Sequence, residues 1–320
     1  MDFFNRLCGM YDKTITDWLL QGDVAIQYLV YRNLLHENRP KLQVQIAHIG
    51  WGKQLLNCQQ PNGHWGRGFY QPKWTSSHYT LLDLKNLGIT PNLAPAATAI
   101  HQILATKKGP DGGLNPSATI LQSDVCVNGM FLNYAAYFDT NEQSLQSIVD
   151  FLLQQILPDG GFNCRYNRPN IGARHSSLHS TLSVLEGIET YARNGYTYRL
   201  AELLQAAQTG REFMLLHRLF LSDHTGQIID HDFLHFAYPG RWHYNILRCL
   251  DYFCEAGIGY DQRMQPAIDV VLKKRKPDGR WNAESNYPGQ QHFVMEQPGK
   301  PGRWNTLRAL RVLGHFGVHV

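Results

Sequence analysis

The sequence lacks long hydrophobic segments, a cysteine framework and any strong imbalance of charge. No stretch is apolar over the roughly 20 residues that a membrane-spanning helix needs, and Met1 to Asp12 lacks the basic and apolar regions of a signal peptide. Of the 320 residues only 18% are charged, with 30 Lys and Arg against 26 Asp and Glu. We therefore expect a soluble, cytoplasmic protein with no integral membrane segment.

The cysteines and the basic residues argue against two further classes of protein. The six cysteines have no framework spacing, so we expect them to be reduced; they lie at positions 8, 58, 126, 164, 249 and 254. The densest basic cluster, Lys273 to Lys276, is short and precedes a turn, which is typical of a solvated helix end. We expect neither a disulfide scaffold nor a nucleic-acid partner.

The sequence does contain an internal repeat. In four places the end of an apolar helix is followed by Asn-Gly or Asp-Gly and then by an aromatic or apolar residue, in segments 55–65, 104–114, 152–162 and 272–281. Glycine at that place allows the positive φ that ends a helix and turns the chain. The repeats run almost end to end, so we expect one domain over residues 1–320, with 1–50 an atypical capping hairpin and 51–320 the repeats.

A second helix is expected after each turn, and its start aligns without gaps in five places. These starts are His78, Cys126, His179, His243 and Trp304, and a small hydroxyl or amide residue follows each two positions later: Thr80, Asn128, Thr181, Asn245 and Thr306. Equivalent positions in a closed array face the same way, so we expect the five side chains to ring one end of a common axis. With no competing run of alternating β-formers, the pattern predicts an all-α fold: an α/α toroid, a closed ring of about five to six helical hairpins.

The turn motif resembles the repeat of the prenyltransferase and squalene-cyclase superfamily. Asp124-Val-Cys126 at one ring helix, with His179 at the phase of Cys126 in the next repeat, resembles the zinc site of protein prenyltransferase β subunits. The resemblance implies that Asp124, Cys126 and His179 bind Zn²⁺, and Cys164 and His175 are further candidate ligands. Two features depart from the superfamily: the Asp-x-Asp-Asp motif of terpene cyclases is absent, and residues 113–123 carry no basic residue for a diphosphate.

These features favour a zinc-dependent enzyme that acts on a small or isoprenoid-like substrate in the central cavity. The resemblance implies a prenyltransferase-like transferase, whereas the loop without basic residues favours a zinc hydrolase or lyase. His78, His243 and Trp304 are candidates for direct participation, and Arg241 is suited to hold an anionic substrate group. The alternative is a non-catalytic ligand-binding toroid with a structural zinc, and no docking stripe points to a protein partner.

Overall fold

Helices account for all the regular structure in the described part of the chain. The computed structural model describes residues 11–117, 120, 122–164 and 173–318, and within these it contains isolated antiparallel bridges but no strand. Short 3₁₀ turns lie at Lys73–Thr75, His231–Leu234 and Gln262–Met264. The α-helices are α2 (Lys13–Leu20), α3 (Val24–Asn33), α4 (Pro40–Gln45), α5 (Gly50–Asn57), α6 (Ser77–Asn86), α7 (Ala94–Thr106), α8 (Val125–Tyr137), α9 (Glu142–Leu153), α10 (Leu178–Arg193), α11 (Leu200–Leu216), α12 (Ile246–Glu255), α13 (Gln265–Lys273) and α14 (Arg303–His315).

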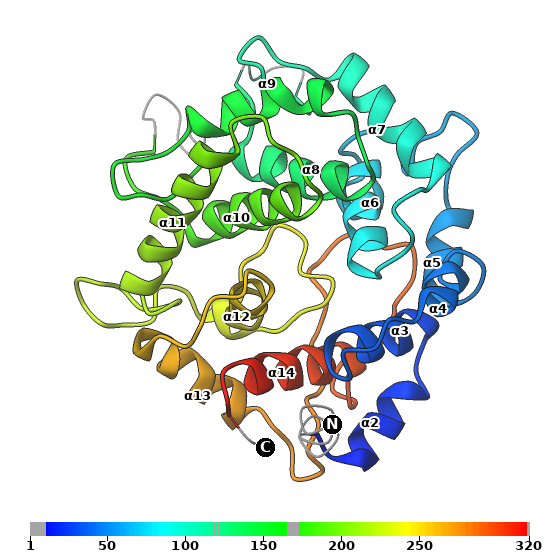
Figure 1. The fold of residues 1–320 in the computed structure, drawn as a ribbon, viewed down its shortest axis with the longest axis vertical. Coiled ribbons are helices and arrows are strands. Elements are labelled where there is room, and N and C mark those ends of the chain that lie inside the picture. Colours follow the sequence, from blue (N-terminus) through cyan, green and yellow to red (C-terminus); the bar gives the residue numbers. More distant parts are fainter. Residues whose placement is uncertain (1–10, 118–119, 121, 165–172, 319–320) are drawn as a thin grey trace.

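The helices form a closed double ring, so the predicted α/α toroid is confirmed (Figure 1). The inner ring consists of α3, α6, α8, α10, α12 and α14, and α14 packs against α3 to close it. Outer helices, among them α7, α9, α11 and α13, alternate with the inner ones along the chain. In the part of the chain that the structure describes, no helix combines the length and the apolar character needed to cross a membrane.

Burial differs between the two rings as their positions require. The inner helix α8 is buried on nearly every face, and its polar Asn128 and Asn133 are buried with the apolar residues. The outer helix α9 buries one face only, formed by Leu145, Ile148, Val149, Phe151 and Leu152. A helix between two layers has no solvent face, whereas an outer helix needs one apolar stripe.

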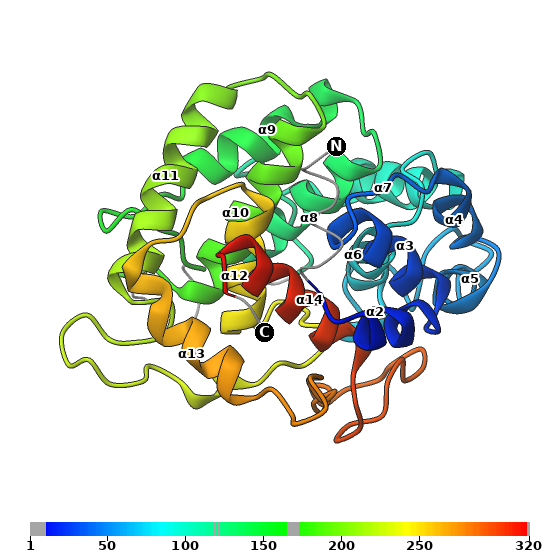
Figure 2. The same cartoon turned by 60° about the horizontal axis from the view of Figure 1, so that its bottom comes forward.

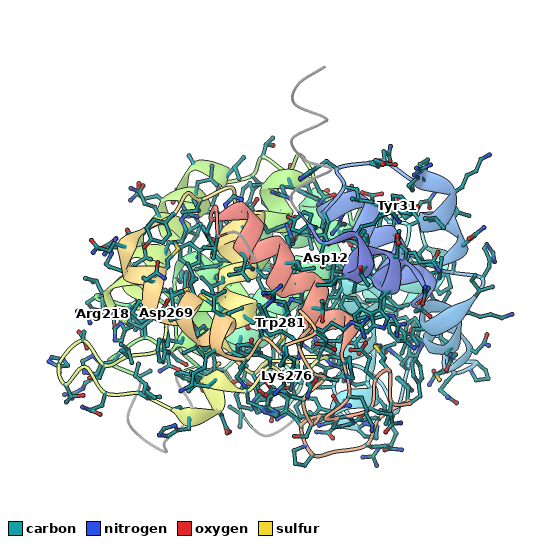
Figure 3. The ribbon with its side chains drawn as sticks, turned by 90° about the horizontal axis from the view of Figure 1, so that it is seen from below. Asp12, Tyr31, Arg218, Asp269, Lys276 and Trp281 are labelled. Carbon is teal, nitrogen blue, oxygen red and sulfur yellow. The ribbon has the colours of Figure 1, made fainter. Side chains whose placement is uncertain are left out.

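The four predicted turns adopt the expected backbone, and a side chain joins most of them to the ring. Their glycines have positive φ, between 78° and 88°: Gly63, Gly112, Gly160 and Gly279. After three of these turns a backbone N–H donates to the small polar residue of the following inner helix: Leu114 to Asn128 (2.7 Å), Phe162 to Thr181 (3.0 Å) and Trp281 to Thr306 (3.0 Å). The repeated hydroxyl or amide therefore satisfies a buried backbone donor. Figure 3 shows Trp281 close to α13, in the turn that leaves it.

Four predicted helix starts agree with the structure and one does not. The helices predicted to begin near His78, Cys126, His179 and Trp304 begin one residue earlier in each case, at Ser77, Val125, Leu178 and Arg303. The helix predicted from His243 begins only at Ile246. Asn245 is extended and its side chain accepts a hydrogen bond from the N–H of Arg248, so the amide that matched the repeat is an N-cap here.

Candidate functional site

The ends at which the inner helices begin are covered by two long connections. Segment 226–245 precedes α12 and segment 282–302 precedes α14, and Figure 2 shows both at the same end of the ring. The Trp74 indole N–H donates to the carbonyl of Pro288 (2.6 Å), and Thr80 Oγ1 lies 2.9 Å from His292 Nε2. These contacts hold the second connection across the start of α6, so the helix starts do not surround an open mouth.

His78 is enclosed by aromatic rings. Its side chain is fully buried, and the centroids of four rings lie within 5.5 Å of its own, those of Phe69, Tyr70, Tyr79 and Tyr134. Nδ1 lies 3.2 Å from the Tyr134 hydroxyl, and Nε2 has no partner in the described part of the chain. Burial lowers the pKa of His78 to about 3, so the imidazole is neutral near pH 7.

His179 and His243 are neighbours, as their equivalent positions predict. Their ring centroids are 6.1 Å apart, and His243 stacks between Trp242 (3.9 Å) and Tyr287 (3.5 Å). Burial lowers the pKa of both imidazoles to about 4. The backbone N–H of Tyr244 donates to Nδ1 of His179 at 2.7 Å, which leaves the proton of the neutral ring on Nε2.

The structure brings together Asp124, Cys126 and Cys164. The sulfurs of Cys126 and Cys164 are 3.4 Å apart, and the backbone N–H of Cys126 points at the Cys164 sulfur (3.5 Å). The hydrogen bond from Cys126 lowers the pKa of the Cys164 thiol, whereas the same contact and burial raise the pKa of Cys126. Burial also raises the pKa of Asp124, against the attraction of Lys73.

As placed, these residues do not fit the predicted zinc site. His179 interacts with the segment before α12 rather than with the two thiols, and its Nδ1 already accepts a hydrogen bond. A zinc-bound imidazole uses one nitrogen as ligand and donates a proton from the other, which that bond precludes. His175 is exposed, and no group of three or more His, Cys, Asp and Glu side chains among the described residues is arranged to hold a metal ion. Zinc binding therefore stays a prediction.

A central cavity of about 300 Å³ lies within the inner ring. All six inner helices contribute to its wall, mostly from their second halves. Tyr238, Gly240 and Arg241 reach it from the covering connection. Two predicted site residues, Arg241 and Trp304, line this cavity. His78, Cys126, His179 and His243 do not, so the five ring positions do not share one cavity.

The cavity wall carries more positive than negative side chains. Seven are cationic and four are carboxylates: Arg32, Lys85, Arg193, Arg241, Arg248, Arg308 and Arg311 against Glu186, Glu189, Asp251 and Glu255. Each carboxylate has an arginine partner; for example, Arg248 pairs with Glu186 (2.6 Å) and Arg308 with Asp251 (3.0 Å). Arg241 pairs with the buried Asp83 of α6.

Among the described residues, two cations of the wall have no ion pair and two neutral donors have no hydrogen-bond partner. Among the described residues neither Lys85 nor Arg32 makes an ion pair, and burial lowers the pKa of Lys85. The Trp304 indole N–H and the Tyr238 hydroxyl, whose rings stack at 4.0 Å, have no hydrogen-bond partner within the described chain. The unsatisfied groups are thus mainly hydrogen-bond donors.

Sequence reasoning missed most of this wall. Lys85, Arg193, Arg248, Arg308 and Arg311 lie within or at the ends of inner helices, where the repeat pattern predicts burial. These residues could have been found from the sequence, because a charged residue on a helix that is otherwise apolar on every side indicates a functional site.

Comparison with known proteins shows the fold and no family. No protein-family model matches the chain, and no curated protein matches it significantly. Among solved structures, a glycosyl hydrolase of family 88 from Bacteroides vulgatus is 13% identical, with a TM-score of 0.53, and the match covers 97% of this chain and 97% of that chain. A polysaccharide lyase is 12% identical, with a TM-score of 0.52, over 97% of this chain and 96% of that chain.

A type II terpene cyclase from Scytonema is 13% identical, with a TM-score of 0.36, over 85% of this chain and 96% of that chain. The hydrolase and the lyase, matched over nearly their whole length, have the fold that the ring of hairpins shows here. At such low identity the similarity extends to the fold alone.

Proposed function

We propose that this chain binds a small anionic substrate in the central cavity of the toroid. The observation that carries the proposal is the surplus of donors in the wall: the carboxylates are paired with arginines, while among the described residues Lys85 makes no ion pair and the buried Trp304 indole and Tyr238 hydroxyl have no hydrogen-bond partner. A buried donor without an acceptor costs about 1–3 kcal/mol. An oxyanion bound among these groups would remove that cost.

Compensation of the helix dipole is a competing explanation for part of the wall. Lys85 and Arg193 lie in the last turns of α6 and α10, where a cation is stabilised by about 0.3–1 kcal/mol. That explanation does not extend to Arg308, which lies in the middle of α14, or to the neutral Trp304 donor.

The rim of the cavity supports a substrate that exchanges with solvent rather than a permanently enclosed ligand. Arg32 is exposed and the Arg193 side chain is 50% exposed, although both belong to the cavity wall. The density of charge also disfavours an isoprenoid chain, which needs an apolar wall.

Calorimetric titration with inorganic phosphate and with a panel of small phosphate esters and carboxylates tests the proposal. We expect at least one of these anions to bind at 150 mM salt, and we expect Lys85→Met to weaken that binding by at least about tenfold, since one charge-assisted bond contributes about 1.5–3 kcal/mol. Lys273→Met is the matched control, because it removes the same charge from the exposed end of α13.

Two outcomes would contradict the proposal. The first is the absence of binding by every anion tested to the folded wild-type protein. The second is equal weakening by Lys85→Met and Lys273→Met, which would indicate attraction to the net charge of +4 rather than a site in the cavity. Circular dichroism of both variants establishes that they are folded.

A further inference from the structure

Cys126 and Cys164 form a pair that neither the anion site nor the fold requires. Cys126 lies in the first turn of α8, and Cys164 follows the turn that ends the next repeat, 38 residues later. We propose that these two cysteines are a redox site, which closes into an intramolecular disulfide when the protein meets a small disulfide oxidant such as oxidised glutathione.

The proximity of the sulfurs is the first observation behind the proposal. They are 3.4 Å apart, so bond formation requires them to approach by little more than about 1 Å, to the usual S–S length of about 2.05 Å. The N–H of Cys126 points at the Cys164 sulfur, which places the Cys164 side chain directly against the backbone of its partner. Among the described cysteines, no other two sulfurs are in contact.

Access to the pair is the second observation. Cys126 is partly exposed, whereas Cys164 is 7% exposed, with Ser180 Oγ 3.6 Å from its sulfur. An oxidant from solvent therefore meets Cys126 first. Cys249, by contrast, is fully buried in α12 and has no neighbouring thiol in the described chain.

The reaction is a thiol–disulfide exchange in two steps. Cys126 reacts first because it is the more exposed thiol, although its pKa is raised. It loses its proton to solvent, and the thiolate attacks one sulfur of oxidised glutathione, which forms a mixed disulfide and releases one glutathione thiolate. The Cys164 thiol then loses its proton and attacks the Cys126 sulfur, which releases the second glutathione thiolate. Both thiolates take up protons from solvent, so two protein thiols are oxidised as one glutathione disulfide is reduced to two thiols.

Cys126 and Cys164 were also both predicted zinc ligands. Zinc binding and disulfide formation by this pair exclude each other. A zinc ion would hold both sulfurs as thiolates and prevent the disulfide, but among the described residues Asp124, Cys126 and Cys164 are not arranged to hold a metal ion. The disulfide requires only the two thiols. Their placement therefore favours the redox site.

The test is to treat the reduced full-length protein with oxidised glutathione, then unfold it and alkylate the remaining thiols. Mass spectrometry of the intact chain should show two fewer alkylated cysteines and the loss of two hydrogens, and peptide mapping should join residues 126 and 164. Cys164→Ser should stop at a glutathione adduct on Cys126. Cys58→Ser, a change at another partly exposed cysteine, should leave the disulfide intact.

Two results would overturn the proposal. One is full alkylation of Cys126 and Cys164 after prolonged exposure to excess oxidant, with the wild-type fold retained by circular dichroism. The other is one equivalent of zinc in protein purified without chelator that is lost in both Cys126→Ser and Cys164→Ser. Because the oxidation is measured on wild-type protein, it is informative even if a serine variant does not fold.

Discussion

His78 lies at the start of an inner helix, where burial among four aromatic rings determines its protonation. The folded protein lowers the pKa of this imidazole to about 3 from an ordinary value of 6.5. Between pH 6.5 and pH 3 the unfolded chain therefore binds a proton at His78 that the folded chain does not bind. Its contribution to stability is fully present above pH 6.5 and is lost progressively as the pH falls toward 3.

We predict that His78→Asn makes the stability of the protein less sensitive to mild acid. Between pH 6.5 and pH 5 the wild-type histidine should account for a loss of about 2 kcal/mol, since each pKa unit corresponds to about 1.4 kcal/mol. Asparagine can keep a hydrogen bond to Tyr134 but does not titrate. Urea unfolding at several pH values measures the slope.

The control for this prediction is His224→Asn, because the His224 side chain is 90% exposed. That variant should have the wild-type pH slope. If His78→Asn also retains the full wild-type slope, the imidazole of His78 is not excluded from protonation in the folded state.

At the scale of single residues, the sequence predicted only some of the side chains that lie together. Asp124, Cys126 and Cys164 were all candidates and do lie together, but His179 faces the connection before α12. Repeat phase predicts where a helix starts. It does not predict which long connection covers that start, and here segments 226–245 and 282–302 determine the surroundings of both His179 and His78.

The inner helices α8 and α10 approach each other closely. A Cβ added at Gly187 would lie 2.5 Å from the carbonyl oxygen of Gly129, and one added at Gly129 would lie 2.7 Å from that of Ser183. Only glycine at both positions allows the backbones to approach so closely. These inner helices are therefore held at a spacing that larger residues do not permit.

We predict that Gly187→Ala destabilises the protein although alanine is the better helix former. The gain in helix propensity is about 1 kcal/mol, whereas the backbone clash forces two buried helices apart, and overpacking of this kind typically costs about 1–3 kcal/mol and occasionally more. The urea midpoint should fall without a change in the m-value.

Gly210→Ala on α11 is the matched control for this change. There the added Cβ meets the end of the Leu185 side chain at 3.0 Å, a group that can move. Its stability should stay within about 1 kcal/mol of the wild type. A Gly187→Ala variant as stable as Gly210→Ala would contradict the close approach of α8 and α10.

At the scale of elements the sequence was most informative. The turn glycines and the small polar residues after the helix starts both have the roles that a repeat requires, because each satisfies a local backbone need. The α12 start differs because Asn245 caps the helix instead of joining a turn. The hydrogen bond between a turn and the next inner helix depends on residues that are close in the sequence. The different start of α12 depends instead on the long connection before it.

On the scale of the whole molecule, α3 decides whether the ring is closed. It packs against α14 on one side, and Tyr28 packs against Gly88 after α6 on the other. The α2–α3 hairpin also holds the first residue of α14, since the Arg303 guanidinium lies 4.5 Å from the Trp18 ring. The central cavity exists only with this closure, because Leu29, Arg32 and Asn33 form part of its wall. The sequence repeats predicted a closed ring, but they did not indicate that α3 belongs to its inner layer, since the first hairpin lacks the turn motif.

We predict that Leu29→Ala lowers the stability of the entire ring in one cooperative transition. Leu29 is 3% exposed on α3, and a leucine truncated to alanine in a core typically costs about 2–5 kcal/mol. Tryptophan fluorescence reports on positions around the ring, among them Trp65, Trp242 and Trp281, and far-ultraviolet circular dichroism reports on all helices. Both urea midpoints should shift by the same amount with an unchanged m-value. Val44→Ala on α4, where the side chain is 50% exposed, should shift them by less than about 0.5 kcal/mol. If the first hairpin were instead an independent cap, Leu29→Ala would split the two midpoints, and the ring of hairpins from residue 51 onward would unfold as in the wild type.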